Sequence, residues 1–183
     1  MIAALAGRRI DAPNAPEPHF PPANIAAVER AIRARLERDG VRVLVCAAAC
    51  GADLLALAAA EELRIARHIV LPYAIERFRA GSVTDRRGAY PWGERYDRFI
   101  AQAQSQHALT LLGLDPNDPS VYEKTNFGIL DTAAAIAAGM HEAAEAIVVW
   151  DEELRTGHDL TEHFANAAHA RNMPVVSISI LRP

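Results

Sequence analysis

The sequence has little of what marks secreted, membrane-spanning or metal-binding proteins. Only two of its 183 residues are cysteines, Cys46 and Cys50. Two thiols at a strand end do not favour a disulfide, and one Cys-x3-Cys pair without a second pair is a poor zinc site. No apolar run reaches the roughly 20 residues of a membrane span. The first residues are apolar before they are charged, the reverse of a secretory signal, so we expect a cytoplasmic protein.

The sequence also lacks a strong charge of either sign. Its formal net charge is −4, which argues against broad electrostatic contact with nucleic acid or an anionic membrane but leaves room for a local basic pocket. With 51% hydrophobic and 23% charged residues, the chain suits one globular domain over residues 1–183. Alanine is abundant, yet no repeat or low-complexity linker interrupts the pattern.

Short apolar runs alternate with helical patterns along most of the chain. The pattern predicts strands over Ile2–Gly7, Val41–Ala47, His68–Pro72, Ala108–Leu114, Ala146–Trp150 and Val175–Leu181. It predicts helices over 25–36, Ala52–Ala66, Ile75–Val83, Tyr90–Gln106, Tyr122–Ala138 and Asp159–Arg171. Asn24 is expected to cap the first of these helices. Such alternation demands right-handed crossovers and predicts an α/β fold, a three-layer αβα sandwich with a mainly parallel sheet.

In sheets of this kind, ligands bind outside the carboxyl ends of the strands. The segments placed at that edge are rich in glycine and polar residues, which supports the predicted layout. They are residues 7–9, 49–53, 72–73, 115–122 and 151–161. We therefore expect the functional residues to come from these turns.

The turn Cys50-Gly51-Ala52-Asp53 joins a buried strand to a helix. Glycine allows a close approach of a ligand to the backbone, and a helix N-terminus presents free N–H groups that suit a phosphate. Asp53 has two interpretations. It either complements the helix dipole as a structural acid, which we favour on the turn alone, or it holds a ribose hydroxyl or an amine.

Arg8 and Arg9 directly follow the first predicted strand. Two guanidinium groups at a strand end are able to clamp a phosphate or a carboxylate. The alternative is a solvated pair, or a salt bridge to Asp11. The residues do not decide between these interpretations.

A second strand-to-helix junction with a glycine lies at Thr156–Phe164. Asp159 and His163, or His158 and Glu162, are four residues apart and would share a helical face. Each pair supplies only two metal ligands. We therefore expect no metal there, and favour capping, surface charge or an organic ligand.

Two helical patterns combine aromatic and polar side chains. Trp92, Tyr96 and Phe99 follow helical spacing and are expected to pack in the core, with a ligand-covering lid as the alternative. Tyr122 and Asn126 form a second pair at i and i+4 whose role the spacing leaves open. The chain contains no nucleophile elbow, Walker loop or GxGxxG motif. These patterns alone indicate an α/β ligand-binding domain.

The order of several short phrases resembles the SLOG superfamily of Rossmann-like domains, which includes the LOG phosphoribohydrolases and nucleotide-sensing modules. The phrase GRRIDAP, followed by FPP, is similar to that family's opening, and ACGADLLA is similar to its phrase after the second strand. The phrases LPY, FRAGSV, RYDR, YEKTN and VVWD continue in the same order. The likeness spans nearly the whole chain and is greatest to bacterial members. It implies a Rossmann-like fold and a nucleotide-type ligand.

The chain departs from the LOG enzymes in the loop PGGxGTxxE, whose glycines cradle a phosphate and whose Glu assists cleavage of an N-glycosidic bond. The matching junction here reads Gly157-His158-Asp159-Leu160-Thr161-Glu162. His158 replaces a glycine, and an acid stands close to the anion-binding amides. Arg8 replaces the family's opening His, and Ala58 stands where the family carries an acid. The resemblance therefore implies a weakened phosphate cradle, with Glu162 matching the family's acid by position.

Together these features predict a domain that binds a nucleotide or a nucleotide derivative, without a further cofactor, metal, nucleic acid or membrane partner. The expected ligand-binding residues are Gly7, Arg8, Arg9, Cys50, Gly51, Ala52, Asp53, Tyr122, Asn126, Asp151, Gly157, His158, Asp159 and Thr161. The first alternative is a nucleotide N-glycosidase with Glu162 and Arg8 or Arg9 as its catalytic pair. The second is an interaction module without a small ligand, in which the alanine-rich helix Thr132–Ala144 pairs with a second copy. A homo-oligomer is expected.

Overall fold

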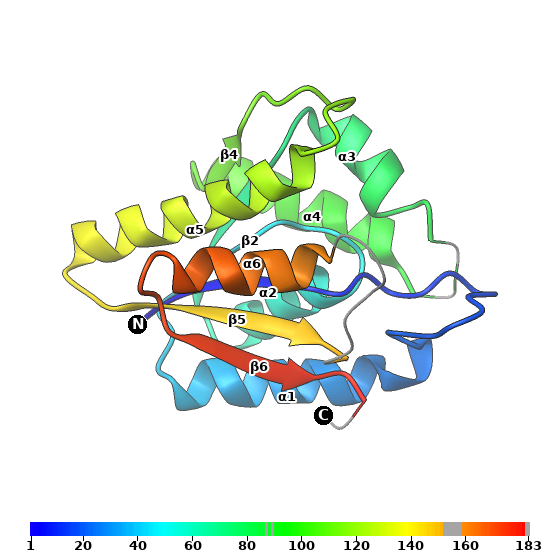
Figure 1. The fold of residues 1–183 in the computed structure, drawn as a ribbon, viewed down its shortest axis with the longest axis horizontal. Coiled ribbons are helices and arrows are strands. Elements are labelled where there is room, and N and C mark those ends of the chain that lie inside the picture. The colour runs from blue at the N-terminus through cyan, green and yellow to red at the C-terminus, as the bar shows by residue number, and fades with distance from the viewer. Residues whose placement is uncertain (87, 89, 152–158, 182–183) are drawn as a thin grey trace.

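A computed structural model describes residues 1–86, 88, 90–151 and 159–181 of the chain. Within these residues, six strands form one parallel sheet in the order β4-β3-β2-β1-β5-β6 (Figure 1). The strands are β1 (Ile2–Gly7), β2 (Val43–Cys46), β3 (Ala66–Leu71), β4 (Leu109–Leu111), β5 (Ala144–Trp150) and β6 (Val175–Ser179). The predicted α/β class, with its parallel sheet and interleaved helices, is confirmed as a Rossmann-like fold.

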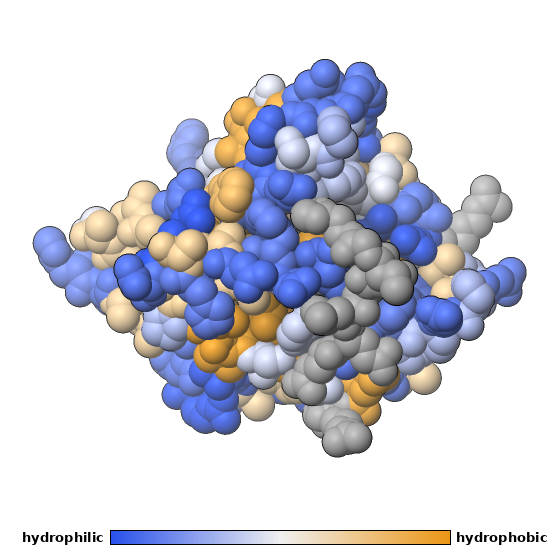
Figure 2. Space-filling model, in the orientation of Figure 1, coloured by the Kyte–Doolittle hydropathy of each residue, from blue (hydrophilic) through white to orange (hydrophobic). Residues whose placement is uncertain are grey.

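Helices cover both faces of the sheet. They are α1 (Ile25–Arg38), α2 (Ala52–Glu62), α3 (Ile75–Ser82), α4 (Trp92–Ser105), α5 (Val121–Met140) and α6 (Leu160–His169), with a short 3-10 helix, η1 (Pro22–Asn24). Helices α1 and α2 pack against each other on one face, and α5 and α6 pack against each other on the opposite face (Figure 1). The face formed by α5 and α6 is mainly hydrophilic, with an apolar area over β5 and β6 (Figure 2). Among the described helices, none has both the length and the apolar character that crossing a bilayer requires.

The strand order contains one reversal. From β1 the chain moves outward through β2, β3 and β4, and it then returns to place β5 and β6 on the other side of β1. Gly7 at the end of β1 lies opposite Val149 of β5. In open α/β sheets the crevice at such a reversal, outside the carboxyl ends of the strands, is the usual place for a ligand.

The core explains the alanines of α2. Helix α2 is buried from Ala52 through Ala60, because it packs against α1, against α4 and against the sheet. Small side chains let this helix approach all of these neighbours closely. In α4, Trp92, Tyr96 and Phe99 are also buried, and the Tyr96 hydroxyl donates to the Ile75 carbonyl at 2.9 Å. The packing interpretation of this aromatic stripe is therefore confirmed.

The ends of two helices differ from those that the sequence pattern predicts, since α2 stops earlier and α5 continues past Ala138. Helix α2 stops at Glu62 instead of Ala66, because Arg64 adopts a left-handed conformation with φ of 58° and Ala66 already starts β3. Helix α5 ends at Met140, and His141 is left-handed with φ of 53°. The alanine-rich segment Thr132–Ala144 is therefore not one continuous helix.

Asn24 does not cap α1 as expected. It lies in η1, its side chain makes no capping hydrogen bond to α1, and its Nδ2 donates to the Ile180 carbonyl at 2.9 Å. Asn24 does occupy the N-cap position as predicted, but a 3-10 turn precedes the helix, so that Asn24 already has a helical backbone and its side chain does not cap. Its amide instead joins the start of α1 to the end of β6.

Candidate functional site

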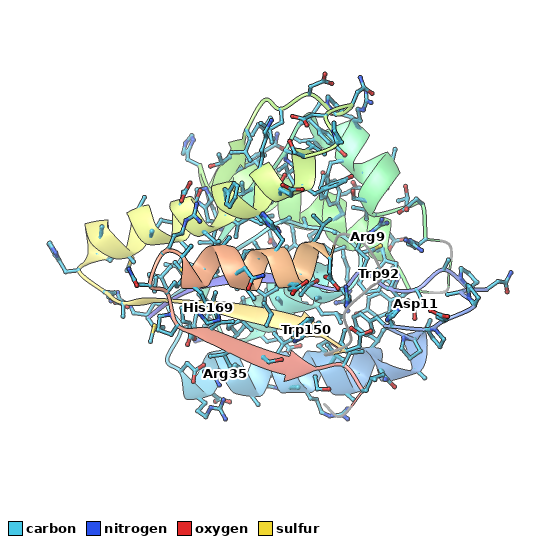
Figure 3. The ribbon with its side chains drawn as sticks, in the orientation of Figure 1. Arg9, Asp11, Arg35, Trp92, Trp150 and His169 are labelled. Carbon is cyan, nitrogen blue, oxygen red and sulfur yellow. The ribbon has the colours of Figure 1, made fainter. Side chains whose placement is uncertain are left out.

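A cavity of about 450 Å³ lies at the carboxyl ends of β1 and β2, close to the reversal in strand order. Its walls come from the loop after β1, from the starts of α2, α5 and α6, and from α3 with the segment that follows it. Arg9 and Asp11 lie at this end of the sheet, whereas Arg35 and His169 lie toward the opposite end (Figure 3). A volume of this size matches typical small-molecule sites.

The cavity brings together part of the predicted site. The candidates that line it are Gly7, Arg8, Arg9, Asp53, Tyr122, Asn126 and Thr161. The candidates that are described but do not line it are Cys50, Gly51, Ala52, Asp151, Asp159 and Glu162. Gly157 and His158 lie outside the described residues. Within this second group, the side chains of Cys50, Asp151 and Asp159 contact arginines that line the cavity.

Arg8 is a buried structural ion-pair residue rather than a solvated one. Its side chain is 4% exposed, and its Nη2 lies 2.9 Å from Asp151 Oδ1 and 2.8 Å from Asp159 Oδ2. Its Nε also donates to Asp151 Oδ1 at 2.9 Å. Both structural alternatives for Arg8, a solvated side chain and a bridge to Asp11, are therefore wrong. Asp11 instead accepts the backbone N–H of Phe20 at 2.8 Å.

The two carboxyl groups around Arg8 are stabilised in their ionised form. Burial by itself would raise the pKa of Asp151, but hydrogen bonds from His19 and Arg8 and the charge of Arg8 lower it. Burial acts against Asp159 in the same way, and Arg8 with two backbone N–H groups lowers its pKa. The cluster joins the ends of β1 and β5 to the start of α6, so it fixes the geometry of the cavity wall.

Arg9 faces a more open environment. Its Nη2 contacts the Asp85 carboxylate and lies 3.5 Å from the Cys50 Sγ, a partner that the sequence pattern did not indicate. Arg86 also lines the cavity, and its Nε is 3.6 Å from Asp85. The Nε atoms of Arg9 and Arg86 are both buried without a hydrogen-bond partner among the residues that the structure describes. The cavity wall therefore holds, besides Arg8, the guanidinium groups of Arg9 and Arg86, which share the Asp85 carboxylate.

Gly51 does allow a close backbone approach, but the segment that approaches it is the loop after β1 rather than a ligand. Gly51 has φ of 114° and forms an antiparallel bridge with Arg9. A Cβ atom here would lie 2.6 Å from the Arg8 carbonyl oxygen and from the Ile10 nitrogen. The N–H of Ala52 donates to the Arg8 carbonyl at 3.1 Å. This amide at the start of α2 is consequently not available to a phosphate, contrary to the expectation from the turn.

Asp159, the residue directly before α6, caps the start of this helix. Asp159 Oδ1 accepts the N–H groups of Thr161 at 2.9 Å and Glu162 at 3.3 Å. This confirms the capping interpretation of Asp159. Since these amides are occupied, the junction does not offer them to a phosphate. Among the described residues, no group of three or more potential metal ligands is present.

Among the acids that line the cavity, Asp53 has the pKa that departs most clearly from its ordinary value. It is 7% exposed, and its Oδ2 accepts the N–H of Ala49 at 3.1 Å. Its side chain thus stabilises the turn before α2. This role is structural, but it differs from capping the helix. Burial raises the pKa of Asp53 from 3.8 to about 7, although the Ala49 N–H and the Arg9 charge act in the opposite direction.

The raised pKa of Asp53 predicts a pH-dependent stability. Between pH 4 and 7 the folded state binds more protons at this residue than the unfolded state, so its contribution to the free energy of unfolding falls as the pH rises. The difference between the two pKa values changes the free energy of unfolding by at most about 4 kcal/mol, at about 1.4 kcal/mol per pKa unit. Asp53→Asn keeps an acceptor for Ala49 and cannot ionise. We expect this variant to be more stable than the parent at pH 8 but not at pH 4.

Urea denaturation of both proteins at pH 4, 6 and 8 measures this difference. Asp131→Asn, at an exposed position of α5, is the control and should show no such trend. A constant stability difference between Asp53→Asn and the parent at all three pH values would contradict the prediction.

The sequence analysis missed several residues that line the cavity. Ser82 and Thr125 are both buried there. The Tyr122 hydroxyl lies 3.3 Å from Ser82 Oγ and 3.1 Å from the Tyr73 hydroxyl, and burial with the Tyr122 contact raises the pKa of Tyr73 to about 12. Thr125 was detectable, because it follows Tyr122 by three residues and so shares a helical face with it. Ser82 had no comparable signal.

No protein-family model matches the sequence, and no curated protein matches it. One similar solved structure is the X-ray structure of DNA processing protein A (DprA) from Streptococcus pneumoniae. The two chains are 15% identical with a TM-score of 0.41, over 99% of the present chain and 59% of the other. The present chain thus spans about three fifths of that protein. The fold assignment rests on the sheet order described above, and membership of the SLOG superfamily stays a prediction.

Proposed function

We propose that this domain binds a nucleotide or a nucleotide-derived ligand in the cavity at the carboxyl ends of β1 and β2. The observation that carries this proposal is the position of a cavity of about 450 Å³ beside the reversal in strand order, with the guanidinium groups of Arg8, Arg9 and Arg86 in its wall. Ligands of Rossmann-like sheets bind at this position. Since the amides of Ala52 and Thr161 are occupied within the chain, we assign recognition of the ligand to side chains.

The cavity carries groups for each part of a nucleotide. The guanidinium groups of Arg9 and Arg86 both line the cavity and suit a phosphate, because guanidinium groups bind phosphate oxygens through directed hydrogen bonds. Tyr122 is 37% exposed at the start of α5 and offers a ring against which a base would stack. Ser82 and Thr125 contribute hydroxyl groups nearby. This division assigns the phosphate to the arginine side and the base to the α5 side.

The structure gives less support to hydrolysis by the predicted catalytic pair. Glu162 does not line the cavity, and Arg8 is held in the buried cluster with Asp151 and Asp159. We therefore propose binding rather than N-glycosidase activity. A sensor of this kind would bind its ligand saturably and leave it chemically unchanged.

A thermal-stability screen tests the proposal. Nucleotides, nucleotide sugars, dinucleotides and cyclic oligonucleotides are compared with the corresponding nucleosides and free bases. A ligand at about 100 times its dissociation constant should stabilise the protein by about 2.7 kcal/mol. We expect stabilisation by one phosphate-bearing class. A panel without any stabilising compound, on a well-folded protein, would overturn the proposal.

The phosphate assignment is tested with Arg9→Gln, by calorimetric titration of the compound that the screen identifies. Loss of a charged hydrogen bond is expected to weaken its binding by about tenfold or more, whereas binding of the matching nucleoside should change by less than about twofold. Arg38→Gln is the control, since Arg38 is exposed at the end of α1, at the opposite edge of the sheet. Equal weakening of nucleotide and nucleoside would contradict the assignment.

A further inference from the structure

The loop between β1 and η1 is closed by hydrogen bonds between Asp11 and Phe20, a pair that we call its neck. The loop places a histidine at the cavity. The N–H of Asp11 donates to the Phe20 carbonyl at 3.0 Å, and the N–H of Phe20 donates to Asp11 Oδ2 at 2.8 Å. Phe20 is fully buried and anchors this neck in the core. The adjacent residue, His19, lines the cavity with a side chain that is 21% exposed. Its position is thus set by the fold rather than by a free loop.

The contact between His19 and Asp151 fixes which ring nitrogen carries a proton. Asp151 accepts Arg8 at its Oδ1 and contacts His19 Nδ1 through its Oδ2. An ionised carboxylate only accepts hydrogen bonds, so Nδ1 of His19 must be the donor. In the neutral ring, Nε2 is then an acceptor, which opposes an anion. In the protonated ring, Nε2 becomes a second donor and the ring carries a positive charge.

We propose that His19, held by Asp151, is a proton-dependent anion-binding residue of the cavity, which binds the phosphate of the ligand in its imidazolium form. This inference rests on the proposed function and specifies how the same site recognises charge. Arg9 supplies permanent positive charge, and His19 adds a donor and a charge only when it is protonated. Affinity for a phosphate-type anion consequently increases as the pH falls.

Other charged groups around the cavity set the background for this dependence. Arg8 and Arg9 come from the end of β1, Asp151 from the end of β5, and Asp159 from the start of α6. The remaining ones are Asp53 of α2, Asp85 and Arg86 after α3, and Asp11 and Glu17 of the loop itself, with Asp85 contacting both Arg9 and Arg86. Asp53 acts in the same direction as His19, because burial raises its pKa to about 7 and its ionisation would repel an anion. The two contributions must therefore be separated by mutation.

Inorganic sulfate is the probe of choice, because its charge does not change between pH 5.5 and 8. Calorimetric titrations at both pH values are compared for the parent, His19→Gln, Asp53→Asn and His141→Gln. His141 follows α5 at the opposite edge of the sheet and serves as the matched control. A charge-assisted hydrogen bond predicts that the parent binds sulfate about tenfold more tightly at pH 5.5 than at pH 8. In parallel, sulfate should shift the His19 ring resonances in NMR spectra at pH 5.5.

The variants divide the possible results. The inference requires that His19→Gln loses most of the pH dependence while Asp53→Asn and His141→Gln keep a clear part of it. Equal pH dependence in His19→Gln and the parent would overturn it, as would His19 resonances that do not respond to sulfate, or an absence of sulfate binding. If nucleotides bind but His19→Gln leaves their affinity unchanged at both pH values, the inference fails and the proposed function stands. If sulfate binds through His19 but no nucleotide binds, the nucleotide assignment fails instead.

Discussion

Arg8→Ala is expected to destabilise the protein by about 3 to 5 kcal/mol at neutral pH. The substitution leaves two carboxylates, Asp151 and Asp159, in a buried setting without the guanidinium that contacts both of them. Removing one partner of a buried ion pair is costly because the remaining charge stays desolvated. Chemical denaturation at pH 7 measures the loss. Arg38→Ala, at a position whose side chain is 67% exposed, is the control and should change stability by less than about 1 kcal/mol.

The pH dependence of this effect identifies its cause. In the parent, the pKa values of Asp151 and Asp159 are lowered, so their stabilising contribution is present above the unfolded pKa and is lost as the pH falls through the folded one. In Arg8→Ala, burial raises the pKa of both acids without the opposing charge of Arg8. The loss of stability caused by the substitution should therefore shrink toward pH 4, as the two acids become protonated. A loss below about 1 kcal/mol at pH 7, combined with impaired ligand binding, would instead make Arg8 a ligand clamp.

Gly51→Ala is expected to destabilise the protein by about 3 to 5 kcal/mol, combining backbone strain with overpacking. An L-residue rarely adopts φ of 114°, and the new Cβ would meet the Arg8 carbonyl oxygen and the Ile10 nitrogen at 2.6 Å. Both of these atoms belong to backbone, which cannot move aside as a side chain would. The bridge between Arg9 and Gly51 should open, which separates the loop after β1 from the start of α2.

Gly139→Ala provides the matched comparison for this prediction. Gly139 lies in α5, and a Cβ there meets no atom within 4 Å among the described residues. Alanine favours a helix by about 1 kcal/mol relative to glycine, so this variant should be equally stable or more stable. Thermal unfolding of both variants provides the measurement. Similar melting temperatures for Gly51→Ala and the parent would contradict the structural account of the turn.

The sequence was sufficient to predict the fold because each strand carries its own signal. The all-apolar run that contains β2 and the regular apolar face of α1 are local patterns, and the core buries them as expected. Helix ends were less predictable. Arg64 ends α2 inside a run of helix-favouring residues, with no glycine or proline to mark the stop. The strand pairing of Ala66 with Val43 determines that boundary, and such a tertiary contact is not visible locally.

The sequence predicted the edge of the sheet at which the cavity lies, but not the contacts of each residue around it. The carboxyl edge follows from strand order, and the sequence placed Arg9, Asp53 and Tyr122 there. The partners of Arg8 could not be found locally, because Asp151 is 143 residues away along the chain. His19 lies in a proline-rich loop without periodicity, and only the closed neck at Phe20 brings it to the cavity.

Two of the helix N-termini beside the cavity, those of α2 and α6, have amides that bind within the chain, at Ala52 through the Arg8 carbonyl and at Thr161 through Asp159. The scaffold is therefore complete before any ligand arrives, and it is separate from the side chains that face the cavity. Substitutions at Tyr122 or Arg86 would alter what the cavity selects without removing these backbone contacts. Relatives of this chain could then diverge in ligand while keeping the same frame, and the domain offers a starting point for the engineering of new small-molecule receptors.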